Sequence, residues 1–198
     1  MRKLLLATFN SNKVREINQI AQDSGADFEF LYLKDFPDIK EVVEDGSSFE
    51  ENAIKKAQGY YSQANIPTLA EDSGLSVVSL AGSPGIYSSR FAGEEKDDYH
   101  NNLKLLNMLK DETERDAQFI CCAAVVLGPE VAKTFKGILS GNIAEEMKGN
   151  YGFGYDPVFI PFGYNQTLAE IGIKTKNKIS HRKQAITLAL DFLIKLSP

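Results

Sequence analysis

Helical and strand-like patterns alternate along the first half of this chain, and strand patterns then follow one another. Apolar runs at 3–8 and 28–33 flank a segment at 13–24 whose apolar residues recur at helical spacing. Between 118 and 160, short apolar runs separated by turn residues predict hairpin-like strands. Interleaved helices and strands followed by hairpins predict the α/β class, with a mixed sheet, flanking helices and two lobes.

Local signals predict the remaining elements and their ends. We expect helices at 49–64, 97–109 and 179–196, and strands at 68–70, 75–80, 119–127, 131–135, 137–144 and 158–160. Asn10 or Ser11 is expected to cap the first helix and Gly25 to end it, and Ser47 or Ser48 is expected to cap the helix at 49–64. The acidic segment 71–74 is expected to interrupt a strand, and 164–178 to form a loop, because neither carries a regular apolar period.

Length and composition are those of one globular domain. The chain has 198 residues, 43% hydrophobic and 25% charged, which is enough for a sizeable core, so we expect 1–198 to form a single domain. No apolar run approaches the roughly 18 residues of a membrane span. The N-terminus is basic and then apolar, but its apolar run is too short for a signal peptide. It therefore predicts a buried strand.

Charge and cysteine content narrow the class of partner. A net charge of −5 disfavours a general nucleic-acid binder, which needs a basic face. Cys121 and Cys122 are adjacent, so in a strand they point to opposite faces and do not pair. Two unpaired cysteines indicate a reducing cytoplasm, and two scattered histidines give no zinc spacing.

A polar segment joins the first predicted strand to the first predicted helix. A strand-to-helix turn presents backbone N–H groups and a positive dipole end, so it suits a phosphate. An ordinary polar N-cap with a solvated lysine explains the same residues, because the glycines of a P-loop are missing. The segment is Thr8-Phe9-Asn10-Ser11-Asn12-Lys13.

Two acidic groups are candidates for binding a metal ion. The first surrounds Glu44 and precedes Lys56; the second is Glu71 with Asp72. Adjacent carboxylates repel unless a cation lies nearby, and Mg²⁺ binds one or two carboxylates together with substrate phosphates. A solvated acidic loop and an exposed β-turn are the alternatives.

Two later segments could recognise a flat, carbonyl-bearing ligand. In Gly152-Phe153-Gly154-Tyr155-Asp156-Pro157, two glycines flank a ring that could stack on a nucleobase, and a hairpin turn is the alternative. Lys176-Asn177-Lys178-Ile179-Ser180-His181-Arg182 precedes the last helix, where basic residues oppose the helix dipole. An anionic or carbonyl ligand would explain those basic residues.

Taken in order, these segments resemble the inosine/xanthosine triphosphate pyrophosphatase family over nearly the whole chain. The resemblance lies in Ala7-Thr8-Phe9-Asn10 with Lys13 and Glu16, Phe49-Glu50-Glu51-Asn52-Ala53 with Lys56, Asp72-Ser73-Gly74-Leu75, Gly82-Ser83-Pro84-Gly85-Ile86-Tyr87-Ser88 with Arg90, Gly152 to Pro157, and Ile179-Ser180-His181-Arg182. Thr175 departs from the family pattern, because family members often have an acidic residue just before the lysine at the position of Lys176.

The resemblance implies an activity and an architecture. It implies Mg²⁺-dependent hydrolysis of nonstandard purine nucleoside triphosphates (inosine, deoxyinosine and xanthosine triphosphates) to the monophosphate and pyrophosphate. It implies an elongated α/β fold with two lobes around a central cleft, and a homodimer. Neither nucleic acid nor membrane is an expected partner.

The spacing and the resemblance together assign roles to residues. Asp72 is the expected general base and, with Glu44, a metal ligand, Glu71 being the alternative second ligand. Lys56 faces the triphosphate from the opposite side to Lys13. Phe153 is expected to stack on the purine. The expected substrate-binding set is Thr8, Phe9, Asn10, Ser11, Asn12, Lys13, Lys56, Ser73, Arg90, Phe153, Gly154, Tyr155, Asp156, Lys176, His181 and Arg182.

Three other functions fit parts of the sequence. A triphosphate diphosphatase for modified pyrimidines would share the phosphate and metal residues. A nucleotide sensor would bind without hydrolysis, but its site would not need extra acids near phosphates. An RNA-binding domain would need an interleaved basic and aromatic stripe, which is missing.

Overall fold

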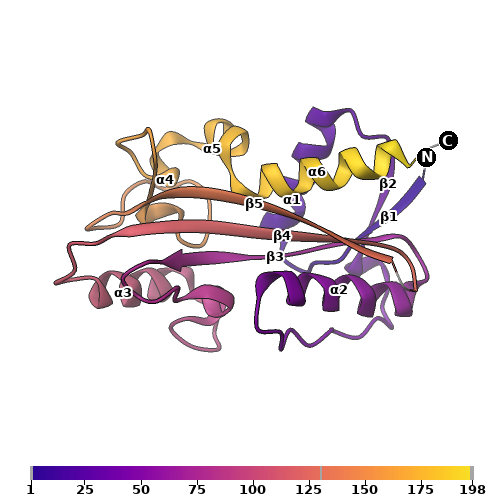
Figure 1. Cartoon of the computed structure of the whole chain (residues 1–198), viewed down its shortest axis with the longest axis horizontal. Coiled ribbons are helices and arrows are strands. Elements are labelled where there is room, and N and C mark those ends of the chain that lie inside the picture. The colour runs from indigo at the N-terminus through magenta and orange to yellow at the C-terminus, as the bar shows by residue number, and fades with distance from the viewer. Residues whose placement is uncertain (1, 130, 197–198) are drawn as a thin grey trace. The chain divides into compact units, whose positions relative to one another are not determined.

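The structure is a computed structural model that describes residues 2–129 and 131–196 (Figure 1). Met1, Glu130, Ser197 and Pro198, which belong to the single domain expected over 1–198, lie outside the described residues. The strands are β1 (Arg2–Leu6), β2 (Phe28–Tyr32), β3 (Thr68–Val77), β4 (Asp116–Gly128), β5 (Val131–Ile143) and β6 (Phe159–Pro161). The α-helices are α1 (Ser11–Ser24), α2 (Phe49–Ala64), α3 (Asp98–Met108), α4 (Leu168–Ile171), α5 (Ile173–Ile179) and α6 (His181–Lys195).

The described strands form a six-stranded sheet in the order β2-β1-β3-β4-β5-β6. Strand β1 pairs in parallel with both β2 and β3, and Leu5 is level with Leu31 on one side and with Thr68 on the other. Strands β5 and β6 are antiparallel. The sheet is therefore mixed and helices flank it, as the sequence predicts.

The chain divides into two compact units. The first unit comprises the described residues within 1–72, 121–137 and 182–198, and the second comprises 73–120 and 138–181. Strands β3, β4 and β5 each contribute residues to both units. None of the helices in the described parts of the chain is long and apolar enough to cross a bilayer.

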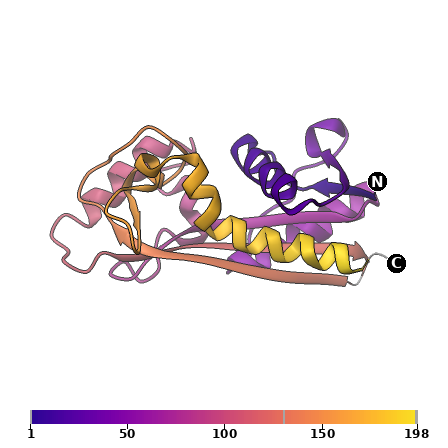
Figure 2. The ribbon, with the colours of Figure 1, turned by 90° about the horizontal axis from the view of Figure 1, so that it is seen from above.

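The core of the first unit lies between the sheet and two helices. Ile17 and Ile20 of α1 and Ala185 and Ala189 of α6 pack against buried strand residues such as Leu6. Figure 1 shows α1 and α6 on one face of these strands and α2 on the other. Figure 2 shows α6 running alongside β5. Both faces of the strands are thus covered, so a polar side chain on either face is removed from water.

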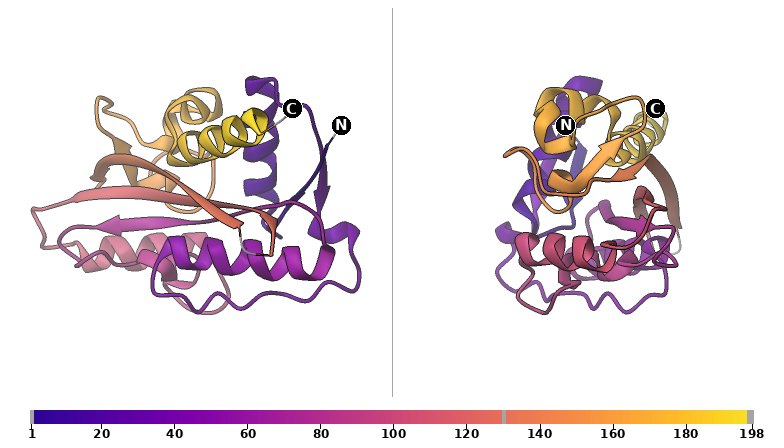
Figure 3. Two further views of the ribbon diagram at one scale, coloured as in Figure 1. Left: turned by 45° about the vertical axis from the view of Figure 1, so that its right-hand side comes forward. Right: turned by 90° about the vertical axis from the view of Figure 1, so that its left-hand side faces the viewer.

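The second unit has its own core. Leu105 and Leu109, in and just after α3, and Leu168 of α4 are buried with Phe119 of β4 and Phe159 of β6. Figure 3 shows α3 on one side of the strands of this unit and the pair α4 and α5 on the other.

The helix ends agree with their predicted caps. Asn10 is the N-cap of α1, where its side-chain oxygen accepts hydrogen bonds from the backbone N–H groups of Asn12 and Lys13. Gly25 ends this helix with a φ of 66°, a conformation that costs glycine little. Ser48 caps α2 through the N–H of Glu51.

Three expectations about elements were wrong. Residues 71–74 do not interrupt a strand, because β3 runs unbroken through them. The two strands expected at 131–135 and 137–144 are one strand, β5. The segment 164–178, expected to be a loop, contains α4 and most of α5. A capping box between Thr167 and Glu170 starts α4, and these helices are too short to show a clear apolar period.

Candidate active site

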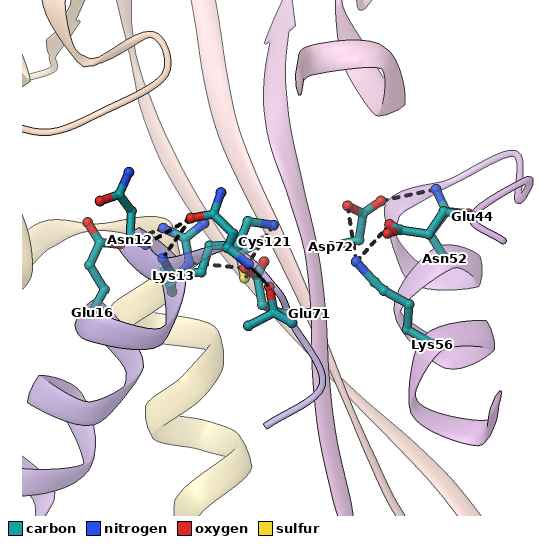
Figure 4. Close-up of polar contacts among 12 residues, drawn as sticks. Asn12, Lys13, Glu16, Glu44, Asn52, Lys56, Glu71, Asp72 and Cys121 are labelled. Atoms are coloured by element: carbon teal, nitrogen blue, oxygen red, sulfur yellow. Dashed lines mark hydrogen bonds and ion pairs between the residues drawn. The ribbon is translucent and has the colours of Figure 1, made fainter. Parts of the chain in front are cut away.

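Two neighbouring acids of β3 point to opposite faces of the sheet (Figure 4). Successive side chains of a strand alternate between faces, so Asp72 lies on the side of α2 and Glu71 on the side of α1 and α6. Both residues are buried, Glu71 at 1% exposure and Asp72 at 9%. The repulsion expected between them is therefore relieved by separation, and each carboxylate has its own cationic partners.

On the α2 face, Asp72 lies within a polar group of the first unit. Its Oδ2 accepts a hydrogen bond of 3.0 Å from Nδ2 of Asn52, and its Oδ1 lies 3.7 Å from Nζ of Lys56. The same Nζ lies 2.7 Å from Oε2 of Glu44. One buried ammonium thus lies between two carboxylates, both of which the sequence selects as metal ligands.

Burial controls the charge states on this face. Burial raises the pKa of Asp72, and the neighbouring Glu44 adds to the rise, while Lys56 opposes it. Burial alone would lower the pKa of Lys56, but the carboxylates of Asp72 and Glu44 outweigh it and the pKa is raised. Lys56 therefore stays protonated, and Asp72 is a stronger base than an ordinary aspartate.

Asn52 is a member of this group that the sequence argument did not select. Besides donating to Asp72, its Oδ1 accepts a hydrogen bond of 2.8 Å from the backbone N–H of Gly46, and the side chain is 2% exposed. A Cβ at Gly46 would lie 2.7 Å from this oxygen, so the backbone approaches too closely for any other residue without a shift. Its position within the segment Phe49-Glu50-Glu51-Asn52-Ala53, on the same helix as Lys56, was the only signal.

On the α1 and α6 face, Glu71 belongs to a buried ionic cluster. Its Oε1 lies 2.9 Å from Nζ of Lys13 and 3.3 Å from Nε of Arg182. Arg182 also pairs through Nη1 with Oε2 of Glu16 at 2.5 Å. The cluster thus contains two acidic and two basic side chains from β3, α1 and α6, so its formal charges balance.

This cluster holds Glu71 in its ionised form. Burial would raise its pKa, but the charges of Arg182 and Lys13 outweigh that effect and hold the pKa of Glu71 well below its ordinary value. The thiol of Cys121 lies 3.4 Å from the same carboxylate. Burial and Glu71 raise the pKa of Cys121 well above its usual range, so the thiol is neutral.

Several of the backbone N–H groups that were predicted to bind a phosphate form hydrogen bonds within their own segment. The N–H groups of Asn12 and Lys13 already bond to the side chain of Asn10, and the N–H of Asn10 bonds to Oγ1 of Thr8. Phe9 is 56% exposed and meets Tyr60 edge-on at 6.4 Å. Lys13, whose side chain is 15% exposed, supplies the fixed positive charge of this segment.

The α2 face fits a magnesium site. Mg²⁺ prefers carboxylate oxygens and needs few of them, because water and substrate phosphates complete its shell. Glu44 and Asp72 supply such oxygens, one on each side of the Lys56 ammonium. No group of three or more His, Cys, Asp or Glu suited to a metal ion occurs among the described residues. Glu71 points to the other face of the sheet, away from Glu44 and Asp72.

In the second unit, the loop around Phe153 is built on Asp156. Oδ2 of Asp156 accepts hydrogen bonds from the backbone N–H of Phe153 at 2.9 Å and from Nζ of Lys176. Gly152 has a φ of +86°, and a Cβ there would lie 1.9 Å from the same oxygen. A side chain at Gly152 would therefore displace the carboxylate that holds the loop.

Lys176 and Phe153 are also in direct contact. Nζ of Lys176 lies 4.5 Å from the centroid of the Phe153 ring, a cation–π geometry that orients both side chains. His181 is 4% exposed and stacks on Phe119, with ring centroids 4.8 Å apart and planes 6° from parallel. The stack leaves the edge of the imidazole, rather than its face, for polar contacts.

The remaining predicted residues have contacts that do not by themselves indicate a ligand. The Tyr155 hydroxyl donates to the backbone carbonyl of Ser88, and burial together with Asp98 raises its pKa. The Arg90 guanidinium lies over Tyr87 at 5.2 Å. Ser73 is half-buried in β3. Arg182 belongs to the first unit with Glu16 and Glu71, whereas Lys176 and His181 belong to the second.

The fold and these two groups define an α/β protein with a carboxylate–lysine centre in one unit and, in the other, a buried Asp–Lys pair in contact with a half-buried phenylalanine ring. The chain belongs to the Ham1 family, whose model matches residues 4–192. The resemblance read from the motifs is confirmed.

Proteins similar to this chain come from several bacteria. A protein of Bacillus subtilis strain 168 named dITP/XTP pyrophosphatase is 45% identical over 188 residues, 94% of each chain. A protein of the same name from Geobacter sulfurreducens is 45% identical over 195 residues, 98% of this chain and 97% of its own. The solved structure of the Staphylococcus aureus Ham1 protein matches with a TM-score of 0.88 at 39% identity, covering 98% of this chain and 99% of that one.

Proposed function

We propose that this protein hydrolyses nonstandard purine nucleoside triphosphates, those of inosine, deoxyinosine and xanthosine, to the monophosphate and pyrophosphate in a Mg²⁺-dependent reaction. The observation that carries the proposal is the pair Glu44 and Asp72 around Lys56. A site for a polyanion and its metal needs both signs of charge buried together, and a binding domain without a reaction has no use for the buried base. The names of the relatives support the same reaction.

The triphosphate is assigned to Lys13 and Lys56. Each is held by a carboxylate on its own face of β3, so each is oriented before a ligand arrives. At about 4 Å and an effective dielectric of about 20, one lysine–phosphate contact is worth roughly 4 kcal/mol before desolvation. Thr8 and Asn10, which shape the turn before α1, hold Lys13 near the first turn of that helix.

Glu44 and Asp72 would hold Mg²⁺, which supplies charge neutralisation to the phosphates when it is bound. Asn52 orients the Asp72 carboxylate through its amide hydrogen bond. Asp72 takes the proton of the attacking water, a role that its raised pKa favours. Phosphoryl-type transfer depends mainly on position and charge, so these residues suffice without a covalent nucleophile.

The purine is assigned to the second unit. The base stacks on the ring of Phe153, whose backbone and side chain are held by Asp156 and Lys176. Lys176 and His181 donate to the 6-oxo group of hypoxanthine or xanthine, and Asp156 fixes Lys176. Adenine carries an amino donor at that place, which would leave these donors unpaired.

Arg182 has a second role in this proposal. Its Nε and Nη1 bond to Glu71 and Glu16, so the guanidinium stabilises the cluster that orients Lys13. Its part in reading the base stays a prediction, tested by the ratio of inosine to adenosine triphosphate turnover in Arg182→Ala. An unchanged ratio would assign Arg182 to the cluster alone.

Product analysis tests the reaction. Purified protein with inosine triphosphate and Mg²⁺ is expected to release one pyrophosphate per inosine monophosphate, and a chelator is expected to stop the reaction. Release of orthophosphate, or no turnover, would overturn the proposal. A panel that includes modified pyrimidine triphosphates separates it from a general diphosphatase.

The proposal extends to assembly and location. We assign the protein to the cytoplasm, where its substrates arise, and to a homodimer, on the resemblance alone. Sedimentation velocity is expected to give about twice the chain mass of 21.9 kDa. A mass of one chain at micromolar concentration would contradict the dimer.

A further inference from the structure

A single residue next to Phe153, Gly154, is held by helix α3 through both of its backbone polar groups. The backbone N–H of Gly154 donates to Oδ2 of Asp98 at 2.7 Å. The backbone carbonyl of Gly154 accepts from Nδ2 of Asn102 at 2.8 Å. Both polar atoms of Gly154 are therefore bonded to side chains 52 and 56 residues away in the sequence.

The two side chains are well placed to act together. Asp98 and Asn102 are four residues apart on α3, so they lie on one face of the helix. The Asn102 amide also donates to the Asp98 carbonyl at 2.7 Å, which fixes its orientation. Asp97 caps the helix through two backbone N–H groups, so the first turn that carries Asp98 is itself held.

The burial of Asn102 requires an explanation. It is 1% exposed, and a buried amide is costly unless its hydrogen bonds are made. An apolar residue would fill the same space in the core beside Leu105 without that cost. Its Nδ2 donates to the carbonyls of Asp98 and Gly154, whereas its Oδ1 has no hydrogen-bond partner among the described residues. The unpaired oxygen adds to the cost of burying the amide, so the bond to the Phe153 loop is what explains its presence.

These bonds fix the backbone on both sides of the Phe153 side chain. On one side, the N–H of Phe153 itself bonds to Asp156. On the other side, the next residue, Gly154, is bonded to α3. With its backbone held at both ends, the ring retains only its side-chain torsions, and Lys176 restricts those.

We propose that Asp98 and Asn102 are positioning residues that set the Phe153 ring for stacking on the purine. The inference rests on the proposed function, because it assumes that Phe153 contacts the base. It places a determinant of substrate affinity on α3, a helix for which the sequence indicates no functional role. Neither residue touches the substrate, so their loss weakens binding more than the chemical step.

The chain contains no tryptophan, which makes a direct test possible. Phe153→Trp introduces a single tryptophan fluorophore, whose emission is separable from that of the tyrosines, at the proposed stacking position. Titration with inosine triphosphate in the presence of a chelator is expected to quench its emission, since stacking on a purine alters the indole environment. Asn102→Ala and Asp98→Ala are then made in this background, with Asn107→Ala, an exposed asparagine of the same helix, as the matched control.

The expected result separates positioning from general stability. Asn102→Ala and Asp98→Ala should each raise the dissociation constant about tenfold, the order expected for one lost hydrogen bond. They should also lower the fluorescence anisotropy of the reporter without ligand, because the ring becomes mobile. In the Phe153 background they should raise KM about tenfold and change kcat less than about threefold. Asn107→Ala should change none of these.

A conservative variant guards against loss of folding. Asp98 is exposed, so its substitution is compatible with a folded chain, and Asp98→Asn keeps an oxygen acceptor for the Gly154 N–H. Asp98→Asn should therefore restore most of the affinity that Asp98→Ala loses. Equal affinity and anisotropy for Asp98→Ala and Asn107→Ala would overturn the inference. If instead Phe153→Trp hydrolyses inosine triphosphate but shows no quenching, the stacking role in the proposed function fails.

Discussion

Glu71 and Asp72 show how one step along a strand reverses the chemistry of a carboxylate. Both are buried, yet cationic neighbours hold the pKa of Glu71 well below its ordinary value, while burial raises that of Asp72. The difference arises because β3 turns one residue toward Lys13 and Arg182 and the other toward Lys56. One acid is thus a fixed charge and the other is suited to accept a proton.

At this scale the first prediction concerns Asp72. Asp72→Asn keeps the shape of the side chain but removes the base, so kcat for inosine triphosphate should fall about 10²- to 10⁴-fold. Equilibrium dialysis should still show nucleotide binding. Asp45→Asn, at an exposed aspartate paired with Lys55, is the matched control and should be close to wild type. Turnover retained in Asp72→Asn would remove it as the base.

A second prediction concerns Asn52. Asn52→Ala leaves the N–H of Gly46 and one oxygen of Asp72 without their amide partner, so the free energy of unfolding should fall by about 1–3 kcal/mol. The value of kcat should fall as well, because the Asp72 carboxylate loses its orientation. Urea unfolding and steady-state kinetics measure the two effects. Loss of stability with an unchanged kcat would make Asn52 structural only.

At the scale of elements, a buried ionic cluster joins a strand to two helices. Glu71 of β3, Lys13 and Glu16 of α1, and Arg182 of α6 are bonded in one network. Removing one member of such a network is costly, because it leaves an uncompensated charge in a low dielectric. The cluster therefore links the orientation of Lys13 to the packing of the last helix.

The third prediction follows from the sign of the Glu71 shift. A carboxyl whose pKa is lower in the folded state than in the unfolded state stabilises the fold above its unfolded pKa of about 4.3, and that stability is lost as the pH falls toward the folded value. Glu71→Gln should lower the free energy of unfolding by about 3–5 kcal/mol at pH 7. The difference from wild type should shrink below about pH 4.

Urea unfolding between pH 7 and pH 3 measures this difference. Glu29→Gln, at an exposed glutamate of β2, provides the control, for which a difference near zero is expected throughout. A penalty for Glu71→Gln that stays constant into acid would show that the ionised form of Glu71 is not what stabilises the cluster.

At the scale of the whole molecule, the residues proposed for the triphosphate belong to the first unit and those proposed for the purine to the second. The fourth prediction uses fragments as competitive inhibitors. Lys13→Ala should weaken inhibition by inorganic tripolyphosphate and leave inhibition by inosine unchanged. Phe153→Ala should do the reverse, weakening inosine about tenfold, as expected for a lost stacking contact. If both variants weaken both inhibitors equally, the division of roles between the units is wrong.

The sequence alone determined those features that depend on neighbours along the chain. The caps of α1 and α2 and the end of α1 at Gly25 follow from local hydrogen bonding and from the freedom of glycine at positive φ. The mixed α/β class follows from apolar period, and the family follows from the order of the motifs. Lys56 and Asp72 were selected because their types and spacing carry a recognisable chemistry.

Only the tertiary structure decided what depends on distant partners. Two adjacent acids indicated a break in β3, but Lys13 and Arg182 on one face and Asn52 and Lys56 on the other allow them to be buried in a continuous strand. Asn102 could not be selected, because the peptide that it bonds lies 52 residues away. A buried charge or amide is tolerated only where its partner is supplied, and packing, rather than local propensity, brings that partner to it.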